Sequence, residues 1–339
     1  MSNIKTVCFF SHESRAQLQK EQYSIQDFRI LRDLGYEVTV ATCFREIPWG
    51  CDLYLSWWAS GSILPLIKAR LSGKPIIVIA GGNDSMFYRD SRSGVPAGYL
   101  AARWHKQLAA RLSLRFATVV LLVSRFMIED AKALGARAPV VVPNSVATAS
   151  FCPSNGPRQH VTTMFNLEDN VVRLKRGEVF LHSVPLVLRT HPEQTFVVIG
   201  RKGNAYQRLL SLASNLGVGQ SVHFIGSVAN AEVVSWLQRS SVYVQISDTE
   251  TFGVAIAEAM SSGTPVVVSR RGAIPELVGD CGVFVDHNDP ESVAAGIIEL
   301  LAKTEAERRA LGAEARRRIV EHYSYEKRRE AMQQIIAGL

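Results

Sequence analysis

The stretch SVYVQISDTETFGVAIAEAMSSGTPVVV, residues 241–268, decides the fold. Its first six residues alternate and are rich in β-forming side chains, as expected of a buried strand. A short helix follows, and Gly263 and Pro265 end it before the valines at 266–268 begin the next strand. Strand, loop, helix and strand in this order is the layout in which open α/β sheets bind ligands at the carboxyl ends of their strands.

Two glutamates, Glu250 and Glu258, lie around the start of this helix. Eight positions along a helix rise about 12 Å, so one carboxylate can meet the hydroxyls of a sugar while the other meets a ribose. Free N–H groups at the helix start, together with the positive end of its dipole, favour phosphate oxygens. The pair therefore predicts a site for a sugar nucleotide, although glutamates are also ordinary residues on helix surfaces.

Five motifs between Val222 and Val285 carry a resemblance to a known family. They are FIG (224–226), ETFG (250–253), EAM (258–260), GTPVV (263–267) and GAIPE (272–276). In order and spacing they resemble the retaining glycosyltransferases of family 4, which have the GT-B fold. The resemblance implies an α/β protein with two Rossmann-like, doubly wound parallel-sheet domains that face a cleft. Weaker likenesses at residues 35–40, 73–76 and 141–146 extend it over most of the chain.

The resemblance also implies roles for individual residues. Glu250 would position the donor sugar without acting as a base, and Glu258 would bind the ribose of the nucleotide. Backbone amides at the start of the helix would face the diphosphate. The other residues of the implied donor site are Gly226, Thr251, Phe252, Gly253 and Val254.

The reaction that the family performs leaves negative charge on a departing diphosphate, and the protein must stabilise that charge. Many glycosyltransferases use a divalent metal held by an Asp-x-Asp motif, but this motif does not occur in the sequence. We therefore expect a metal-independent reaction without a cofactor. Basic side chains and the helix dipole would neutralise the diphosphate instead.

The basic side chains are expected in the loop after the first strand of the second domain, where the family supplies an arginine and a lysine. Asn166 occupies the arginine position here. The basic residues that follow it are Arg173, Lys175 and Arg176. Because guanidinium groups match phosphate oxygens well, the two arginines, with Lys175, are the predicted phosphate ligands. A solvated basic loop is the alternative, and Arg201, at the end of another strand, is a second candidate.

The first domain is expected to bind the acceptor. The family commonly has a glycine pair after the first strand, but Ser-His-Glu-Ser stands at 11–14, which makes His12 a candidate on the acceptor side. Asp84, in Gly-Gly-Asn-Asp at 81–84, resembles a motif at the family's acceptor cleft and would orient the attacking hydroxyl. A turn closed by the Asp84 side chain is the alternative.

Residues 99–115 mix aromatic, apolar and basic side chains. A helix of this kind either lies on an anionic bilayer or covers the sheet with Trp104 in the core, and the second interpretation is preferred. Trp57 and Trp58 either line the acceptor cleft by stacking or are core aromatics.

The composition is that of a globular protein, since 47% of the 339 residues are hydrophobic and 20% are charged. The net charge of +7 lies in residues 1–150, which carry 18 Lys and Arg against 11 Asp and Glu. This basic half favours an anionic partner such as an acidic membrane face or a phosphorylated acceptor, whereas nucleic acid is not expected. Scattered cysteines and the lack of a signal peptide or spanning run predict the cytoplasm, with peripheral contact at the inner membrane face as an option.

Alternating strands and helices predict two domains. Residues 1–152, joined by the C-terminal helix at about 322–339, would form the acceptor-side domain, and residues 160–321 the nucleotide-sugar domain. A linker rich in Pro, Ser and Gly would lie at 151–160. Among the predicted elements are helices at 22–34, 63–71, 98–114, 178–189 and 305–321.

The leading hypothesis is a retaining glycosyltransferase that moves a sugar from a UDP- or GDP-sugar to a hydroxyl of a glycan, a lipid-linked acceptor or a small molecule. The alternatives are a GT-B epimerase or hydrolase of nucleotide sugars, and a non-catalytic homologue. The last is motivated by Asn166 and the missing glycine pair. A Rossmann dehydrogenase is disfavoured because no Gly-x-Gly-x-x-Gly follows a strand.

Overall fold

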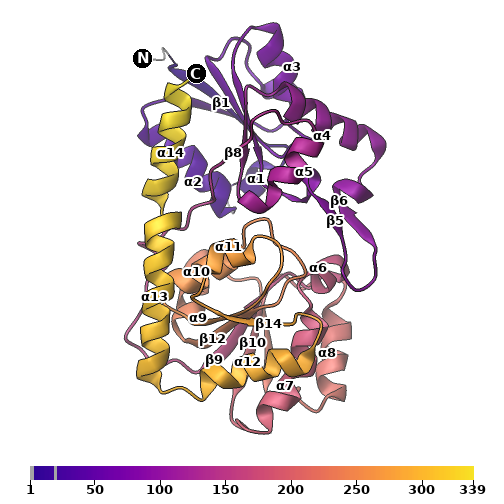
Figure 1. Cartoon of the computed structure of the whole chain (residues 1–339), viewed down its shortest axis with the longest axis vertical. Coiled ribbons are helices and arrows are strands. Elements are labelled where there is room, and N and C mark those ends of the chain that lie inside the picture. Colours follow the sequence, from indigo (N-terminus) through magenta and orange to yellow (C-terminus); the bar gives the residue numbers. More distant parts are fainter. Residues whose placement is uncertain (1–3, 19–20) are drawn as a thin grey trace. The chain divides into compact units, whose positions relative to one another are not determined.

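The structure is a computed structural model that describes residues 4–18 and 21–339. Its contacts divide the chain into two compact units, each with its own parallel six-stranded sheet (Figure 1). Unit 1 comprises Met1–Ser145 and Tyr325–Leu339, and unit 2 comprises Val146–Ser324.

The sheet of unit 1 has the strand order β2-β1-β3-β4-β7-β8, and every neighbouring pair is parallel. Its central strands are buried on both faces, which explains why β4 reads as the unbroken apolar run Ile-Ile-Val-Ile-Ala. The strands are β1 (Thr6–Phe10), β2 (Glu37–Ala41), β3 (Leu53–Trp57), β4 (Ile76–Ala80), β7 (Val119–Leu122) and β8 (Val140–Val141).

Helices of unit 1 connect these strands, and one comes from the other end of the chain. They are α1 (Arg15–Leu18), α2 (Gln22–Asp33), α3 (Ile63–Leu71), α4 (Trp104–Phe116), α5 (Ile128–Ala133) and α14 (Tyr325–Ala337). The helix predicted at 98–114 begins only at Trp104. Gly98 instead ends β6 (Pro96–Gly98), which pairs with β5 (Phe87–Arg89) in a small antiparallel hairpin that the sequence did not predict.

A buried ion pair ties α14 to the rest of unit 1. Arg328 Nη2 donates to Asp27 Oδ2 at 2.8 Å, and Arg328 Nη1 donates to the carbonyls of Val142 and Pro143 at 2.8 and 2.7 Å. Trp57 Nε1 also donates to Asp27, at 3.0 Å. The arginine therefore joins α2, α14 and the end of the sheet through one guanidinium.

We expect Arg328→Met to lower the free energy of unfolding by roughly 3–5 kcal/mol, because it leaves the Asp27 carboxylate buried without its partner. Thermal unfolding of the purified chain measures this loss. Lys327→Met, an exposed position on the same helix, is the matched control and should unfold almost as the wild type does. Equal effects of the two substitutions would contradict the assignment.

The sheet of unit 2 has the order β11-β10-β9-β12-β13-β14, again with parallel pairs only. Its core includes Val161, Phe180, Phe196, Val242 and Ile297, all at most 1% exposed. The strands are β9 (His160–Met164), β10 (Thr195–Ile199), β11 (Val222–Gly226), β12 (Ser240–Gln245), β13 (Val266–Ser269) and β14 (Val283–Val285).

Eight helices of the described part of unit 2 surround this sheet, and α12 packs against α7. Three of them, α6, α9 and α11, were not predicted. The helices are α6 (Asp169–Leu174), α7 (Gly177–Leu188), α8 (Tyr206–Asn215), α9 (Asn230–Gln238), α10 (Val254–Ser261), α11 (Ile274–Val278), α12 (Pro290–Leu301) and α13 (Glu305–Tyr323).

The segment expected to be a linker is held by unit 2. Val146 N donates to the Tyr323 carbonyl at 2.8 Å. Arg158, which is 8% exposed, donates to the carbonyls of Ser240 and Ser262 at 3.2 and 3.1 Å. The chain therefore passes into unit 2 at Val146, and a segment rich in Pro, Ser and Gly is anchored by side chains from that unit.

Candidate functional site

The order of strands in unit 2 reverses between β9 and β12. β9 is followed by β10 and β11 on one side, whereas β12 is followed by β13 and β14 on the other. In open α/β sheets, ligands bind outside the carboxyl ends of the strands at such a reversal. Lys175, which follows β9 and α6, and Glu250, which follows β12, form an ion pair at this point.

The Glu250 carboxylate is fixed by its neighbours. Lys175 Nζ, Ser247 Oγ at 2.7 Å and Gln245 Nε2 at 2.6 Å all donate to Oε1. Among the residues that the structure describes, none donates to Oε2. The side chain is 13% exposed, so it is held in place and still presents one oxygen to a ligand. Glu250 lies in the loop before α10, not on the helix, which corrects the helical spacing assumed for the two glutamates.

The start of α10 comes directly after this loop. Its first residue is preceded by Gly253, whose φ of +96° lies in the left-handed region that favours glycine. In the described part of the chain no side chain caps the helix there, so capping side chains do not take up its first N–H groups. The Phe252 ring is buried and packs edge-on against Tyr323, with 5.6 Å between ring centroids. Only the backbone of Phe252 is thus placed to meet a ligand.

Glu258 lies near Tyr243 of β12. It lies on α10 and is 9% exposed. Burial raises the pKa of the Tyr243 hydroxyl well above its usual value, and the Glu250 and Glu258 carboxylates raise that pKa further. Tyr243 therefore stays protonated and donates to Gln245, whose amide in turn donates to Glu250.

The structure places Arg176 differently from its predicted role as a phosphate ligand. Its side chain is 4% exposed and pairs with the fully buried Asp248, Nη2 to Oδ2, at 3.2 Å. Its backbone has a φ of +54° where the chain turns from α6 into α7. Asp248 also bonds His287 Nε2 at 2.7 Å. This buried pair fixes the loop of Lys175 against the loop of Glu250.

Sequence reasoning missed Gln245, Asp248 and His287. Gln245 is a polar residue between Val244 and Ile246, and Asp248 follows in the same segment, so both carried a signal. His287 carried none, because 39 positions separate it from Asp248 and only the fold brings the two together.

Asn166 and Arg201 are in contact at the ends of β9 and β10. Asn166 Oδ1 accepts the backbone N–H of Arg201 at 3.0 Å. The Arg201 guanidinium is 63% exposed and pairs with Glu168. Gly226, at the end of β11, accepts the N–H of Gly200 at 3.1 Å. Asn166, which occupies the family's arginine position, thus fixes the backbone of Arg201 next to it.

The cationic groups near this edge of the sheet include Lys175, Arg201 and the exposed Arg173. Arg271 is a further one, since its side chain is 43% exposed and lies 3.7 Å from Asp248 Oδ1. Within the described residues, no group of three His, Cys, Asp or Glu side chains is arranged to hold a metal ion. The described side chains and the start of α10 therefore place anion-binding groups at this edge of the sheet.

Unit 1 has a polar cavity of about 410 Å³ at the corresponding reversal of its own sheet, where β2 and β3 flank β1. The loops after β1, β3 and β4 line it. Its lining residues are His12, Glu13, Trp58, Ser60, Asp84, Gly98, Tyr99, Ala102 and Lys106. The cavity brings together three residues that the sequence singled out separately, whereas Trp57 is 1% exposed and belongs to the core.

Two polar atoms are left unsatisfied at the wall of the polar cavity. Trp58 Nε1 and Asp84 Oδ1 are buried and have no hydrogen-bond partner among the described residues. The other Asp84 oxygen accepts the N–H and the hydroxyl of Ser60 at 2.8 and 2.9 Å. Trp58 has a φ of +72°, and its ring packs so closely on Gly82 that a Cβ there would lie 2.1 Å from Cζ3. One donor and one acceptor are the set that a ligand hydroxyl satisfies.

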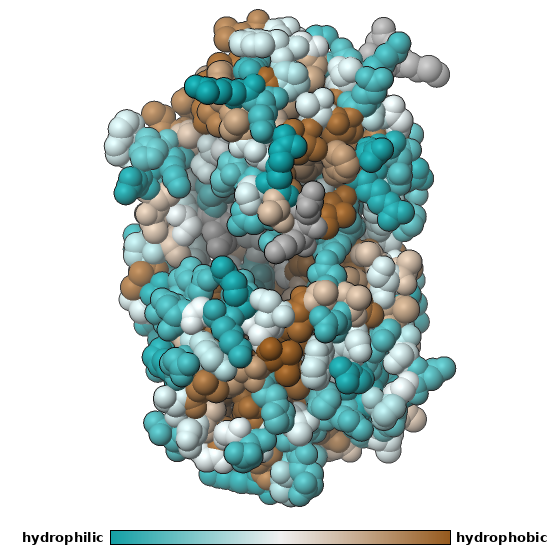
Figure 2. Space-filling model, turned by 180° about the vertical axis from the view of Figure 1, so that it is seen from behind, coloured by the Kyte–Doolittle hydropathy of each residue, from teal (hydrophilic) through white to brown (hydrophobic). Residues whose placement is uncertain are grey.

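Trp104 is 75% exposed, which corrects the preferred prediction that it lies in the core. Leu108, one turn further along α4, is 47% exposed. Figure 2 shows hydrophobic side chains reaching the surface of unit 1 among hydrophilic ones. No helix in the described part of the chain is long and apolar enough to cross a bilayer.

Gly272 lies against the backbone of Glu250. A Cβ added to Gly272 would lie 2.5 Å from the Glu250 carbonyl oxygen and 2.6 Å from its nitrogen. The next residue, Ala273, donates its N–H to the same carbonyl at 2.9 Å. The loop after β13 thus holds the Glu250 loop by close backbone approach.

We expect Gly272→Ala to destabilise the protein more than Gly217→Ala does. Both glycines have left-handed φ values, +58° and +72°, and alanine costs roughly 1–2 kcal/mol there. Only at Gly272 is a steric clash added, since a Cβ at Gly217 would meet nothing within 4 Å. Thermal unfolding of the two variants measures the difference. Equal losses of stability would show that the close contact between Gly272 and the Glu250 backbone is unimportant.

Comparisons with known proteins agree with this geometry. Residues 169–318 match the family model described as "Glycosyl transferases group 1". A D-inositol 3-phosphate glycosyltransferase from Corynebacterium jeikeium is 32% identical over 41% of this chain and 35% of its own length. An MMP alpha-(1->4)-mannosyltransferase from Mycolicibacterium hassiacum is 31% identical over 55% of this chain and 45% of its own length. The matched regions thus span less than half of these relatives.

Solved structures resemble the chain over nearly its whole length. A sucrose-phosphate synthase from Thermosynechococcus elongatus has a TM-score of 0.80 at 15% identity and covers 98% of both chains. Anabaena HepE in complex with UDP and glucose has a TM-score of 0.79 at 15% identity and covers 99% of this chain and 100% of its own.

These matches confirm the predicted GT-B fold. Residues 169–318, which lie in unit 2, thus match the group 1 glycosyl transferases, in agreement with the family 4 type that the motifs of this region resemble.

Proposed function

We propose that the protein is a retaining glycosyltransferase that moves a sugar from a nucleoside diphosphate sugar to an acceptor hydroxyl without a metal ion. The observation that carries this proposal is the Lys175–Glu250 pair beside the uncapped start of α10. It supplies a carboxylate oxygen for sugar hydroxyls, together with a cation and N–H groups for the diphosphate. The UDP-glucose complex of Anabaena HepE, a protein of the same fold, supports a nucleotide-sugar donor.

In the proposed donor complex, Glu250 Oε2 accepts from a hydroxyl of the sugar and Glu258 binds the ribose. The amides of Phe252, Gly253 and Val254 meet the diphosphate. Arg176 acts indirectly, because its pairing with Asp248 positions the loop of Lys175.

During transfer, the bond between the anomeric carbon and the diphosphate oxygen breaks, and the acceptor oxygen bonds to that carbon on the same face. The acceptor proton passes to the departing diphosphate, so the protein supplies no nucleophile. Lys175 stabilises the charge that develops on the diphosphate, and Arg173 and Arg201 add to it. Arg201, held by Asn166, takes the place of the family's arginine in this scheme.

The polar cavity of unit 1 is the proposed acceptor site. Asp84 Oδ1 accepts from the attacking hydroxyl and orients it, while Trp58 Nε1 donates to a second oxygen of the acceptor. The unpaired state of both atoms supports this role, because a buried polar atom without a partner costs free energy until a ligand satisfies it.

We expect sugar transfer from a UDP-, GDP- or ADP-sugar to persist in excess EDTA, because side chains replace the metal. Glu250→Gln should slow transfer roughly 100-fold, since the carboxylate charge beside Lys175 is lost while the shape is kept. Mass spectrometry of the product, with a panel of donors and acceptors, measures both. Glu291→Gln, an exposed position on α12, is the matched control.

Loss of transfer in EDTA that added Mg²⁺ restores would overturn the metal-independent mechanism. Release of nucleotide at the same rate with and without an acceptor would indicate a hydrolase or an epimerase instead. If no sugar nucleotide stabilises the chain in a thermal-shift screen, the proposed donor site is excluded.

The exposed part of α4 supports a peripheral contact with an anionic membrane at the cytoplasmic face. Trp104 and Leu108 project from the helix, and residues 103–116 carry five basic or histidine side chains and no carboxylate. Apolar side chains can enter the interface while the cations meet anionic headgroups.

Trp104→Ala should weaken binding to phosphatidylglycerol vesicles roughly tenfold, because a large apolar side chain no longer enters the interface. Co-sedimentation at low ionic strength measures the change. Trp49→Ala, at a tryptophan that is 61% exposed outside α4, is the control and should bind as the wild type does. Equal binding of all three proteins would exclude α4 as the contact.

A further inference from the structure

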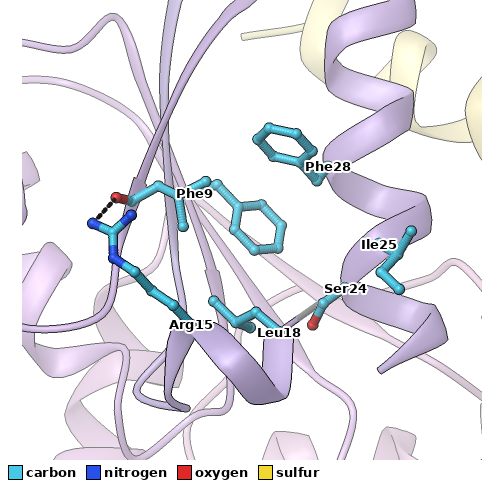
Figure 3. A pocket seen from close by; sticks show the side chains of 7 residues that line it. Phe9, Arg15, Leu18, Ser24, Ile25 and Phe28 are labelled. Carbon is cyan, nitrogen blue, oxygen red and sulfur yellow. Dashed lines mark hydrogen bonds between the residues drawn. The ribbon is translucent and has the colours of Figure 1, made fainter. Parts of the chain in front are cut away.

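Unit 1 holds a second cavity, between the edge of its sheet and the helices α1 and α2. Its volume is about 430 Å³. Five apolar side chains line most of it: Phe9 of β1, Leu18 of α1, Ile25 and Phe28 of α2, and Val40 of β2. Figure 3 shows the Phe9 and Phe28 rings facing this space, whereas the Arg15 guanidinium points away from it and donates to the Val40 carbonyl at 3.4 Å.

The size of this apolar cavity points to an occupant. Protein interiors are close-packed, and voids larger than a water molecule are few. An engineered apolar cavity of about 150 Å³ already binds benzene, and the present one is nearly three times larger. A segment of alkyl chain fits such a space and would bury its carbon surface there.

The apolar cavity also contains one buried hydroxyl and one cation. Ser24 is 2% exposed, and its Oγ has no hydrogen-bond partner among the described residues. Arg15 lies at the rim, with a side chain that is 61% exposed and pairs with Glu46 at 3.3 Å. A ligand with an oxygen at the end of its chain would satisfy Ser24, and a negatively charged head would be attracted to Arg15.

The apolar cavity and the polar cavity are lined by residues that lie close together in the sequence. Glu13 lines the polar cavity, and Arg15, two residues later, lines the apolar one. The Tyr23 hydroxyl donates to Glu13 at 3.1 Å, and the next residue, Ser24, again lines the apolar cavity. Burial and the Glu13 carboxylate raise the pKa of Tyr23, so its hydroxyl remains a donor in this wall.

We propose that the apolar cavity holds the alkyl chain of an amphiphilic acceptor whose hydroxyl-bearing head occupies the polar cavity. This inference rests on the proposed function and names the class of its acceptor, a lipid. The oxygen that joins head and chain bonds Ser24 Oγ as the molecule passes between the two cavities. A soluble saccharide would fill the polar cavity alone and leave the apolar one empty.

Binding of n-butyl, n-hexyl and n-octyl β-D-glucopyranoside to the full chain tests the proposal. Isothermal titration should show affinity rising roughly fourfold for each added methylene, because each one is removed from water. Affinity that does not change with chain length would overturn the proposal. Ser24→Ala should weaken the binding of all three glucosides and leave the dependence on chain length intact.

Ile25→Trp should abolish the dependence on chain length, because the larger ring fills the cavity. Ile67→Trp is the matched control: Ile67 lies on α3, is 42% exposed and does not line the cavity. Persistence of the dependence in Ile25→Trp would overturn the proposal. Circular dichroism establishes that both variants fold.

A measurement on the wild type keeps the test independent of these variants. Octyl glucoside with a diazirine at the chain end should label Phe9, Leu18 or Phe28 on irradiation, and labels only outside the cavity would overturn the proposal. Transfer to acceptors regardless of chain length would leave the proposed function standing and remove the lipid class. Binding that depends on alkyl chain length, without transfer from any sugar nucleotide, would keep the lipid class and remove the proposed function.

Discussion

The buried pair of Asp248 and Arg176 is the constraint on which the donor site depends. Asp248 is fully buried, and its charge is tolerated because Arg176 and Arg271 pair with it and His287 is hydrogen-bonded to it. The pair joins the turn between α6 and α7, which follow β9, to the turn after β12, and the strand order reverses between these two strands. Lys175 is the residue before Arg176, and Glu250 lies two residues after Asp248. The buried pair therefore sets the distance between Lys175 and Glu250. The buried Asp248–Arg176 pair thus holds the loops of Lys175 and Glu250 in place at the donor site.

The sheet of each unit has a reversal of strand order, and the two reversals carry different groups. In unit 2, the reversal of strand order carries carboxylates, cations and the free start of a helix, which suit an activated sugar. In unit 1, it carries a polar cavity in which an indole N–H and a carboxylate oxygen have no partner among the residues that the structure describes, and this pair suits a hydroxyl. The apolar cavity of the same unit extends this second site toward ligands with a carbon chain. Parallel sheets place such groups together because their loops all emerge at one edge.

Several residues are required because segments of the chain lie very close together. The pattern of polar and apolar residues in the sequence does not reveal this requirement. Gly272 allows the loop after β13 to lie against Glu250, and Gly82 allows the Trp58 ring to pack flat on the chain. Arg328 joins the last helix to the first unit through a guanidinium that meets one carboxylate and two carbonyls. These contacts hold functional loops at distances that side chains of ordinary size would not permit.

The sequence by itself determined the parallel α/β class, most strands and long helices, and the motifs around Glu250 and Glu258, because periodicity and turn residues are local properties. It did not determine that Arg176 is buried, that Glu250 precedes its helix, or that Trp104 is exposed. It also missed His287, the β5–β6 hairpin and the apolar cavity of unit 1. Each of these depends on which distant segments meet, and residues such as His287 and Asp248 become partners only when two strands far apart in the chain join one sheet.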